Sequence, residues 1–571
     1  MRPLDWLVLG GALLFFVVYG LYKGRGTGTV KGYLLAGKTM PWYAVALSIM
    51  ATQASAITFI STTGQSYVDG MRFLQFYFGL PLAMVILAAT AVPIFHRTNV
   101  YTAYQYLELR FDAKTRSLVS LVFLIQRGLG LGLTLYALAV VLTVILGWSD
   151  RVTTLLIGGL VIAYTVSGGA KAVAWTDMQQ MLIIFSGVFV ALGTVIYLLP
   201  EGISLRDAVS LAGAAGKLNV VDLSFDWKSR YNIWSGLIGG TFLQLSYFGT
   251  DQSQVQRYLT GKSIAHSRLS LLFNAVAKIP MQFLILFTGA MVFVFFIFER
   301  PPLLFQQVEL NKIHSRAAPR DLEPISHQFN AAFEQRKQAA QGIVEAHRRG
   351  HPALAKQSLA EYRQAQQQLD AARREGARLA EKVDGLPGFN DTNYIFLSFV
   401  TRYMPAGVVG LILAAVFAAA MSSSSGEINS LATVTVIDIY RRHIRKDATE
   451  RHTLRASRIA TAFWGCYAIA FAQYAKNLGA LIEAVNIVGS LFYGGMLGVF
   501  VLAFYFPRVR GTAAFAGVLA GEAAIFCAHF FTQVSYLWYN VIGCLVVVAT
   551  ALAISRFRPG NAMIVPSERS A

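Results

Sequence analysis

Long apolar stretches recur along the whole chain, and short polar segments separate them. A helix of about 20 apolar residues crosses the roughly 30 Å hydrocarbon core of a bilayer, and most of these stretches are that long. We expect about thirteen transmembrane helices, near residues 3–22, 41–62, 74–95, 117–147, 152–168, 175–199, 232–250, 269–298, 402–425, 456–474, 480–505, 511–531 and 536–555. The pattern therefore predicts an all-α membrane protein.

Residues 299–391 interrupt this pattern, because they are polar and rich in Ala, Gln, Arg and Glu. Two helical stretches, 324–349 and 353–384, are separated by the turn signal Gly350-His351-Pro352. Apolar residues recur at heptad-like spacing in the second stretch and more weakly in the first, at Leu359, Tyr362, Leu369, Ala372, Leu379 and Val383, and at Ile325, Phe329, Ala332, Ile343 and Ala346. The spacing predicts an antiparallel helical hairpin of roughly 40 Å, at 1.5 Å per residue.

This extramembrane hairpin divides the chain into three parts. Residues 1–298 hold transmembrane helices 1–8, residues 299–391 form the insertion, and residues 392–571 hold helices 9–13. We expect the hairpin to project from the outer face of the membrane, since long loops cross a membrane regardless of their charge. It is either an arm that docks a protein partner or a solvated insertion that the loop tolerates.

Composition and charge placement agree with a membrane protein. Of the 571 residues 55% are hydrophobic and 14% are charged, and the mean hydropathy is +0.50, which excludes an ordinary soluble protein. The formal net charge is +19, but the basic residues cluster in alternate short loops. This positive-inside pattern places the N-terminus outside and the C-terminus in the cytoplasm. The basic loops are therefore expected to face membrane lipid and not nucleic acid.

Residues 417–440, FAAAMSSSSGEINSLATVTVIDIY, place Ser422 to Ser425 and Glu427 inside an apolar helix. A bilayer offers no water to such groups, so they must face a partner, a cavity or an ion. Hydroxyl and carbonyl oxygens are the ligands that a small hard cation prefers. Taken alone, the stretch predicts either a Na+ site or serines that bond to their own helix and to neighbouring helices.

Two other spans are rich in polar and small residues. Residues 41–62 contain Thr52, Gln53, Ser55 and Thr58, and residues 232–250 contain several glycines and Gln244. Transporters built from inverted repeats place ion and substrate sites at interrupted helices of this kind. Spans two to six and seven to eleven are then the two repeats. Gly and Ser also occur in ordinary close-packed membrane helices, which is the alternative.

Several long motifs resemble the sodium:solute symporter family, which includes sodium/glucose, sodium/proline, sodium/sialic acid and sodium/monocarboxylate cotransporters. The matching pieces cover essentially the whole chain except the insertion: YLLAGKTMPWYAVALSIMATQASAITFIST (33–62), SGGAKAVAWTDMQQ (167–180), YFGTDQSQVQRYL (247–259), FAAAMSSSSGEINS (417–430) and GSLFYGGMLGVF (489–500). The resemblance implies a five-plus-five inverted-repeat core of the bacterial leucine-transporter type, alternating access, Na+ as coupling ion, and a bacterial inner (plasma) membrane.

The resemblance also implies a Na+ site. Carbonyls of the broken first-repeat helix fall on Ala51 and Ala54, and a carbonyl and two hydroxyls of the serine-bearing helix fall on Ala419, Ser422 and Ser423. These last three are i, i+3 and i+4, so they share one helix face. Relatives with a second Na+ use an aspartate and further serines, which match Asp177, Ser422 and Ser425, but Gly426 stands where such relatives have another serine. Asp177 is otherwise a gating or helix-capping residue.

Positions that line the solute pocket in the family map onto eight residues, and one more matches an aromatic inner gate. The pocket positions are Gln53, Ser55, Thr58, Gln75, Tyr77, Gln244, Lys278 and Asn486, and the gate position is Tyr247. Lys278 is either a donor to the solute or a structural contact to backbone carbonyls.

Arg127 lies well inside the fourth span, where arginine is costly and is by default a functional candidate. It resembles the arginine that grips a carboxylate in sialic acid carriers, and a guanidinium suits bidentate carboxylate binding. The alternatives are an internal ion pair with a carboxylate such as Glu483, or a side chain that reaches the membrane surface.

The sequence thus predicts a Na+-coupled symporter that imports a small organic solute, with an organic acid favoured over a sugar or polyol by Arg127. No enzyme is expected, since only His529 of nine histidines lies in a span and the three cysteines suggest no metal motif. The rival from another class is a transporter-like sensor that uses the hairpin to bind a partner.

Overall fold

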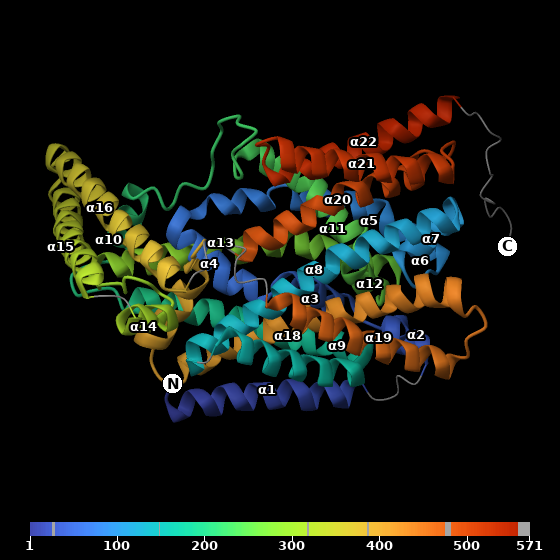
Figure 1. Cartoon of the computed structure of the whole chain (residues 1–571), viewed down its shortest axis with the longest axis horizontal. Helices are drawn as coiled ribbons and strands as arrows, with labels where there is room; N and C mark the ends of the chain where they lie inside the picture. The colour runs from blue at the N-terminus through green and yellow to red at the C-terminus, as the bar shows by residue number, and fades with distance from the viewer. Residues whose placement is uncertain (25–28, 148, 317–318, 385–387, 474–480, 558–571) are drawn as a thin grey trace.

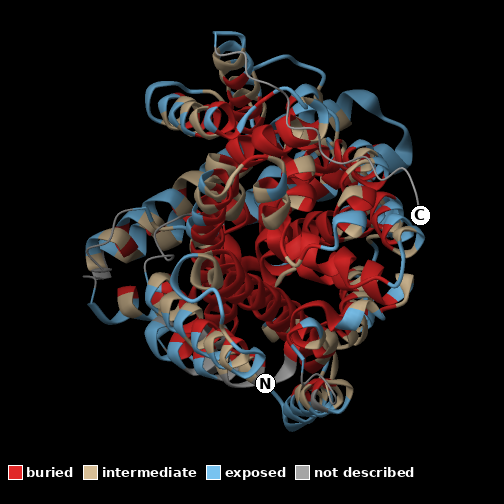
Figure 2. Ribbon diagram, turned by 90° about the vertical axis from the view of Figure 1, so that its right-hand side faces the viewer, coloured by how far each residue is buried: buried red, intermediate tan, exposed pale blue. Residues whose placement is uncertain are grey.

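The computed structural model describes residues 1–24, 29–147, 149–316, 319–384, 388–473 and 481–557. These residues are mostly helical and contain no β-strand. Figure 1 shows long helices lying side by side along one axis, with a smaller group of helices across one end. Viewed along this axis, the buried residues fill the middle of the bundle and the exposed ones lie around it (Figure 2). The expected all-α membrane fold is confirmed.

Each predicted transmembrane segment lies on a helix in its described residues. Nine helices in the described part of the chain, and one bent pair, are long and apolar enough to cross a membrane. The elements that carry the predicted spans are α1 (Pro3–Lys23), α3 (Trp42–Gln53), α4 (Ala56–Asp69), η2 (Met71–Tyr77), α5 (Leu80–Ala89), α6 (Ala91–Thr98), α8 (Ala113–Leu146), α9 (Asp150–Tyr197), η3 (Ser235–Gly239), α11 (Gly240–Gly249), α13 (Ile264–Phe298), α18 (Val408–Val434), α19 (Glu450–Ala472), α20 (Leu481–Tyr505), α21 (Gly511–Phe531) and α22 (Tyr536–Phe557). Residues 474 and 480, at the ends of two predicted spans, lie outside the described residues.

Two predicted spans follow each other directly in α9. Segment 152–168 lies on its first helical half, and segment 175–199, apart from its last two residues, lies on the second half, which begins after a kink at Gly169. There φ is +65°, in the left-handed region that glycine adopts without strain. A Cβ atom at this position would lie 2.9 Å from the Tyr33 ring. The glycine therefore serves both as the kink and as the point of closest approach to α2 (Val30–Leu35).

The span at 41–62 is broken, as the sequence predicts. Its two halves, α3 and α4, are bent by 54° at Ala54 and Ser55, which have non-helical backbone angles. Helix α18 is buried from Val409 to Val434 with the exception of Leu411, and it packs against α3, α4, α8 and α9. The polar serines of α18 thus lie beside the broken helix at the centre of the bundle.

The insertion forms the predicted hairpin. Helices α15 (Pro319–Arg349) and α16 (Pro352–Asp384) are separated by Gly350, whose φ is +67°. The inner face of α16 is buried at regular three- and four-residue steps, at Ser358, Tyr362, Ala365, Leu369, Ala372, Gly376 and Leu379. A shorter helix, α14 (Gln307–Arg316), packs beside α16. Residues 385–387 of the insertion lie outside the described part of the chain.

The hairpin lies across the end of the bundle and does not project away from it, which differs from our expectation (Figure 1). Arg336 of α15 is 1% exposed and donates hydrogen bonds to the Phe296 carbonyl of α13 at 2.5 Å and to Gln366 of α16 at 2.9 Å. Arg348 pairs at 2.5 Å with Asp207 of α10 (Leu205–Ala214). Hydrogen bonds from Arg348 lower the pKa of Asp207 to about 2. Polar contacts in the middle and at the C-terminal end of α15 therefore fix the hairpin to the body.

We predict that Arg336→Met loosens this docking by about 1–3 kcal/mol, because the Phe296 carbonyl loses a buried charged donor. Hydrogen exchange of purified full-length protein should then be faster in α15 and α16 and unchanged in α18. Gln338→Met, at an exposed position two residues away, is the matched control. Identical exchange of Arg336→Met and the wild type would contradict this role of Arg336.

Candidate functional site

The break between α3 and α4 leaves backbone carbonyls free beside the serines of α18. In a continuous helix, Ser55 and Thr58 N–H would bond to the carbonyls of Ala51 and Ala54. Here Ser55 is non-helical and Thr58 N–H donates to the Ser55 carbonyl at 2.9 Å. The hydroxyl of Ser423 donates across the gap to the Thr52 carbonyl at 3.1 Å. The structure thus joins the serine-bearing helix to the broken helix at the predicted Na+ site.

Ser422 faces an aspartate on a third helix. Its hydroxyl donates to Asp177 of α9, and Ser48 of α3 donates to the other carboxylate oxygen at 2.6 Å. A hydroxyl that donates its proton keeps its lone pairs for a cation. Ser422, Ser423 and Ala419 are all at most 1% exposed and lie on one face of α18. Oxygen ligands of this kind suit Na+ chemically.

The candidate second ion site is arranged differently. The hydroxyl of Ser425 donates to the Ser422 carbonyl of its own helix at 3.1 Å. Arg257 of α12 (Gln252–Leu259) lies 3.6 Å from Asp177, so a positive group already faces this carboxylate. A Cβ atom at Gly426 would lie very close to Arg257 Nη2. The guanidinium therefore fills the space that a serine at position 426 would need.

Several predicted pocket residues have buried polar atoms that meet no protein partner in the described part of the chain. These atoms are Gln53 Oε1, both amide atoms of Gln244, Lys278 Nζ and Asn486 Nδ2. Lys278 Nζ lies 5.5 Å from the centre of the Tyr77 ring. Buried polar atoms are normally hydrogen-bonded, so unpartnered ones mark a place for water or a solute. These residues lie on α3, α11, α13 and α20. Helix α13 packs against α3, and α11 packs against α20.

Other predicted pocket residues make protein contacts. The Gln75 amide donates to the Tyr231 carbonyl and accepts from Asp222 N–H, both at 3.0 Å, so Gln75 holds the segment before η3. The Thr58 hydroxyl donates to the Gln53 carbonyl at 3.3 Å, and Ser55 is the residue at the break. The Tyr247 hydroxyl accepts from Gln254 at 2.6 Å, and its ring lies 6.0 Å from that of Tyr493.

Arg127 of α8 lies in a buried cluster of charges. It pairs with Asp251 and, at 3.1 Å, with Glu427 of α18, and it donates to the Tyr493 hydroxyl at 3.1 Å. The Tyr247 ring lies 5.4 Å from the guanidinium. One guanidinium therefore meets two carboxylates, and Glu427 Oε2 has no hydrogen-bond partner in the described residues. The alternative of an internal ion pair is therefore present in the structure, with Asp251 and Glu427 as the carboxylates. Glu483, the example that we gave, is wrong, because it pairs with Arg230 at 2.5 Å.

Sequence reasoning missed five residues of these clusters: Ser48, Asp251, Arg257, Gln282 and Glu427 as a partner of Arg127. Gln282 follows Lys278 by one turn of α13, is fully buried, and has two unpartnered amide atoms. The sequence could have indicated this residue, because Gln282 follows Lys278 by four positions and so lies on the same face of the helix. Asp251 and Arg257 sit in a recognised motif, but their partners lie on α8, α18 and α9, far away in the sequence.

The broken helix and the buried polar clusters around it are features of a membrane transporter. A model of the sodium:solute symporter family matches residues 33–301 and 386–521. The chain belongs to the sodium:solute symporter family, and Na+ is its coupling ion. Residues 302–385, most of the insertion, fall between the two matched segments.

Named relatives and a solved structure agree with this membership. The chain is 28% identical over 527 residues to sodium-coupled monocarboxylate transporter 1 of Mus musculus, covering 91% of this chain and 72% of the relative. It is 25% identical over 566 residues to the sodium/sialic acid symporter SiaT of Proteus mirabilis, covering 98% and 96%. A solved Na+-coupled sialic acid symporter in a substrate-bound, outward-open state has the same fold, with a TM-score of 0.75, 22% identity, and coverage of 98% and 100%.

We predict that Ser423→Ala raises the Na+ concentration for half-maximal uptake about tenfold, which corresponds to one lost ligand of roughly 1.4 kcal/mol. The matched control is Ser430→Ala, because the Ser430 hydroxyl bonds only to a carbonyl of its own helix. Uptake by proteoliposomes across a NaCl series measures both. An unchanged Na+ requirement in Ser423→Ala would exclude Ser423 from the site.

Proposed function

We propose that this protein imports a small organic acid together with Na+ by alternating access. The observation that carries the proposal is the set of buried, unpartnered polar atoms on α3, α11, α13 and α20. One of them belongs to Gln53, the neighbour of Thr52, where Ser423 meets the broken helix. The solutes in the names of the monocarboxylate and sialic acid relatives both carry a carboxylate. Lys278 supplies a buried amine donor with no hydrogen-bond partner among the described residues. The proposed cycle needs no covalent chemistry.

In the proposed cycle Arg127 binds the carboxylate of the solute in place of the carboxylate of Glu427. With both carboxylates ionised, its cluster carries one excess negative charge, which is costly inside a membrane. If the solute carboxylate replaces Glu427 on Arg127 and Glu427 takes a proton, the net charge of the cluster stays the same. The groups around Glu427 are Arg127, Asp251, Tyr247 and the Thr134 hydroxyl. Because the exchange requires Glu427 to take up a proton, uptake should increase as the pH falls.

The test is uptake by proteoliposomes of lactate, N-acetylneuraminate, glucose and a polyol under an inward NaCl or choline chloride gradient. We expect Na+-dependent uptake of a carboxylate, loss of at least tenfold in Arg127→Gln, and uptake independent of pH in Glu427→Gln. Glu522→Gln, a buried carboxylate of α21 outside the cluster, is the control. Na+-dependent uptake of glucose or the polyol alone would contradict an organic acid.

Na+ drives the cycle by joining the broken helix to α18. The ion replaces the direct Ser423–Thr52 contact with a set of oxygens from α3 and α18, namely those of Ala51, Ala54, Ala419, Ser422 and Ser423. This ordering completes the pocket, which includes Gln53, Ser55, Thr58, Tyr77, Gln244 and Asn486. Each Na+ that moves down 100 mV contributes about 2.3 kcal/mol before its concentration gradient is added.

One Na+ accompanies each solute in this proposal. Arg257 supplies the positive charge beside Asp177 and occupies the space next to Gly426, so Asp177, Ser422 and Ser425 do not form a second ion site. We predict a Hill coefficient near 1 for Na+ in uptake and an unchanged Na+ requirement in Ser425→Ala. A Hill coefficient near 2, together with two Na+ per solute in flux measurements, would refute this stoichiometry.

The proposed orientation places the N-terminus and the hairpin outside and the C-terminus in the cytoplasm of a bacterial inner membrane. Figure 1 shows that the start of α1 and the hairpin share one end of the bundle, whereas α22 runs toward the other end. Basic residues of α6, η5 (Thr435–Ile444) and the start of α19 lie at that other end. This distribution follows the positive-inside rule. Arg25 and Arg558, also basic loop residues, lie outside the described part of the chain.

A further inference from the structure

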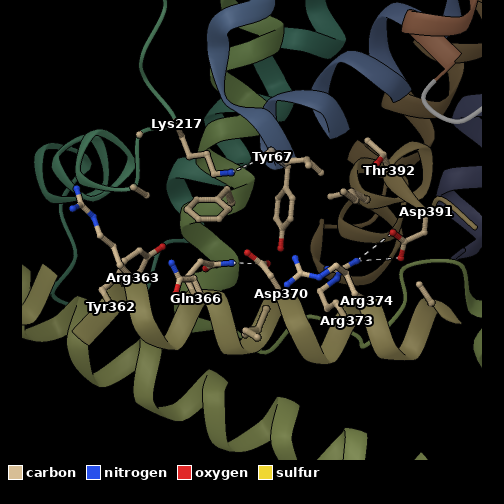
Figure 3. A pocket seen from close by; sticks show the side chains of 18 of the residues that line it. Tyr67, Lys217, Tyr362, Arg363, Gln366, Asp370, Arg373, Arg374, Asp391 and Thr392 are labelled. Carbon is tan, nitrogen blue, oxygen red and sulfur yellow. Dashed lines mark hydrogen bonds and ion pairs between the residues drawn. The ribbon is translucent and has the colours of Figure 1, made fainter. Parts of the chain in front are cut away.

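The hairpin encloses a cavity of about 720 Å³ against the end of the bundle. Helix α16 forms one wall, and Tyr67 of α4, Lys217 after α10, and Asp391 and Thr392 form the other (Figure 3). Most of the insertion lies outside the family match. The wall that α16 contributes is thus a feature of this chain and not of the matched family segments.

The cavity is lined by more basic than acidic side chains. Four basic groups, Lys217, Arg363, Arg373 and Arg374, face two acidic ones, Asp370 and Asp391. Arg373 donates to both oxygens of Asp391 at 3.2 Å, and Asp370 accepts from Gln366 at 2.9 Å. Arg363 and Arg374 are exposed and form no ion pair with any residue that the structure describes. These two guanidinium groups lie roughly 16 Å apart along α16, at 1.5 Å per residue, so each is available to an anion at its own end of the cavity (Figure 3).

The same cavity offers a buried neutral donor. Tyr362 is 3% exposed, and its hydroxyl has no hydrogen-bond partner in the described part of the chain. An unpartnered buried hydroxyl is costly, so a ligand or water at this place would stabilise it. Figure 3 shows Tyr67 reaching from α4 toward the row of Asp370, Arg373 and Arg374 on α16. The aromatic rings of Tyr67 and Phe293 give the cavity an apolar surface beside its charges.

The walls of the cavity are held in place before any ligand binds. Arg336 ties α15 to α13 and to Gln366 of α16, and Arg348 ties α15 to Asp207. Arg373 ties α16 to Asp391, which also accepts from Phe305 N–H at 2.6 Å. A preformed site loses little conformational entropy on binding, which favours affinity.

We propose that this cavity is an outer binding site for the carboxylate-bearing organic anion that the protein transports. Guanidinium groups such as Arg363 and Arg374 match carboxylates in geometry and charge, and the Tyr362 hydroxyl donates to a polar group of the ligand. Tyr67 lies at the end of α4, the same helix whose first turn carries Thr58 of the pocket. The site thus holds the anion at the outer end of a helix that lines the transport pocket. The inference rests on the proposed function for the identity of the anion.

Calorimetric titration of the purified full-length protein with N-acetylneuraminate and lactate tests the proposal. In choline chloride the transport pocket, which needs Na+, binds the anion weakly. Binding measured in that salt therefore reports the outer site. We expect at least tenfold weaker binding in the double variant Arg363→Gln/Arg374→Gln. The matched control is Arg378→Gln/Lys382→Gln, which changes two exposed basic residues of α16 that do not line the cavity.

Burial lowers the pKa of Lys217 to about 8, so binding should also weaken as the pH rises from 7 to 9. Asp69, Asp370 and Arg336 are the charged groups around Lys217.

Absence of binding in choline chloride, or equal binding by the wild type and the double variant, would overturn the outer site. Equal competition by inorganic phosphate would show a site for any anion and would likewise overturn a site for organic acids. Na+-dependent uptake measured on the same preparations separates the two proposals. If uptake of the carboxylate is normal while outer binding is absent, the outer site alone fails. If no preparation, wild type included, transports a carboxylate, the proposed function fails.

Discussion

The contact between α18 and the break of α3 and α4 is the interaction on which the rest of the structure depends. A broken helix in a membrane leaves carbonyls that neither lipid nor water can satisfy, so it persists only where a neighbour supplies polar groups. Ser423 supplies one by bonding to Thr52, and Ser422 extends the polar face to Asp177 and Ser48. A cation placed among these oxygens satisfies several of them together, which couples ion binding to the position of α18.

Buried charges elsewhere in the bundle follow the same rule of compensation. Asp177 faces Arg257, Arg127 faces Asp251 and Glu427, and Arg116 pairs with Asp438 at 2.6 Å. Removing one member of such a pair would leave an uncompensated charge in a medium of low dielectric constant. The Arg127 cluster differs because two carboxylates share one arginine. That imbalance connects solute binding to protonation in our account.

The sequence was most informative where the signal is local. Apolar runs predicted the helices, Thr52 to Thr58 predicted the break, and the i, i+3, i+4 spacing of Ala419, Ser422 and Ser423 predicted a shared face. The sequence could not predict which residues pair in the folded protein. The partners of Arg127, Asp251 and Glu427, lie 124 and 300 residues away from it in the chain. For the same reason Glu483, the example given for an internal partner of Arg127, was not the right carboxylate. The hairpin was predicted from its heptads, but its direction depends on Arg336 and Arg348, whose partners lie on α13 and α10.

Hydrogen exchange at residues 48–60 in NaCl and in choline chloride tests the central claim most directly. If Na+ joins the broken helix to α18, NaCl should slow exchange of these amides in the wild type, and Ser423→Ala should need about tenfold more NaCl for the same effect. Ligands that bind the ordered state stabilise it by mass action, so the effect should saturate with Na+ concentration. Equal exchange in the two salts would contradict a Na+ site at the break.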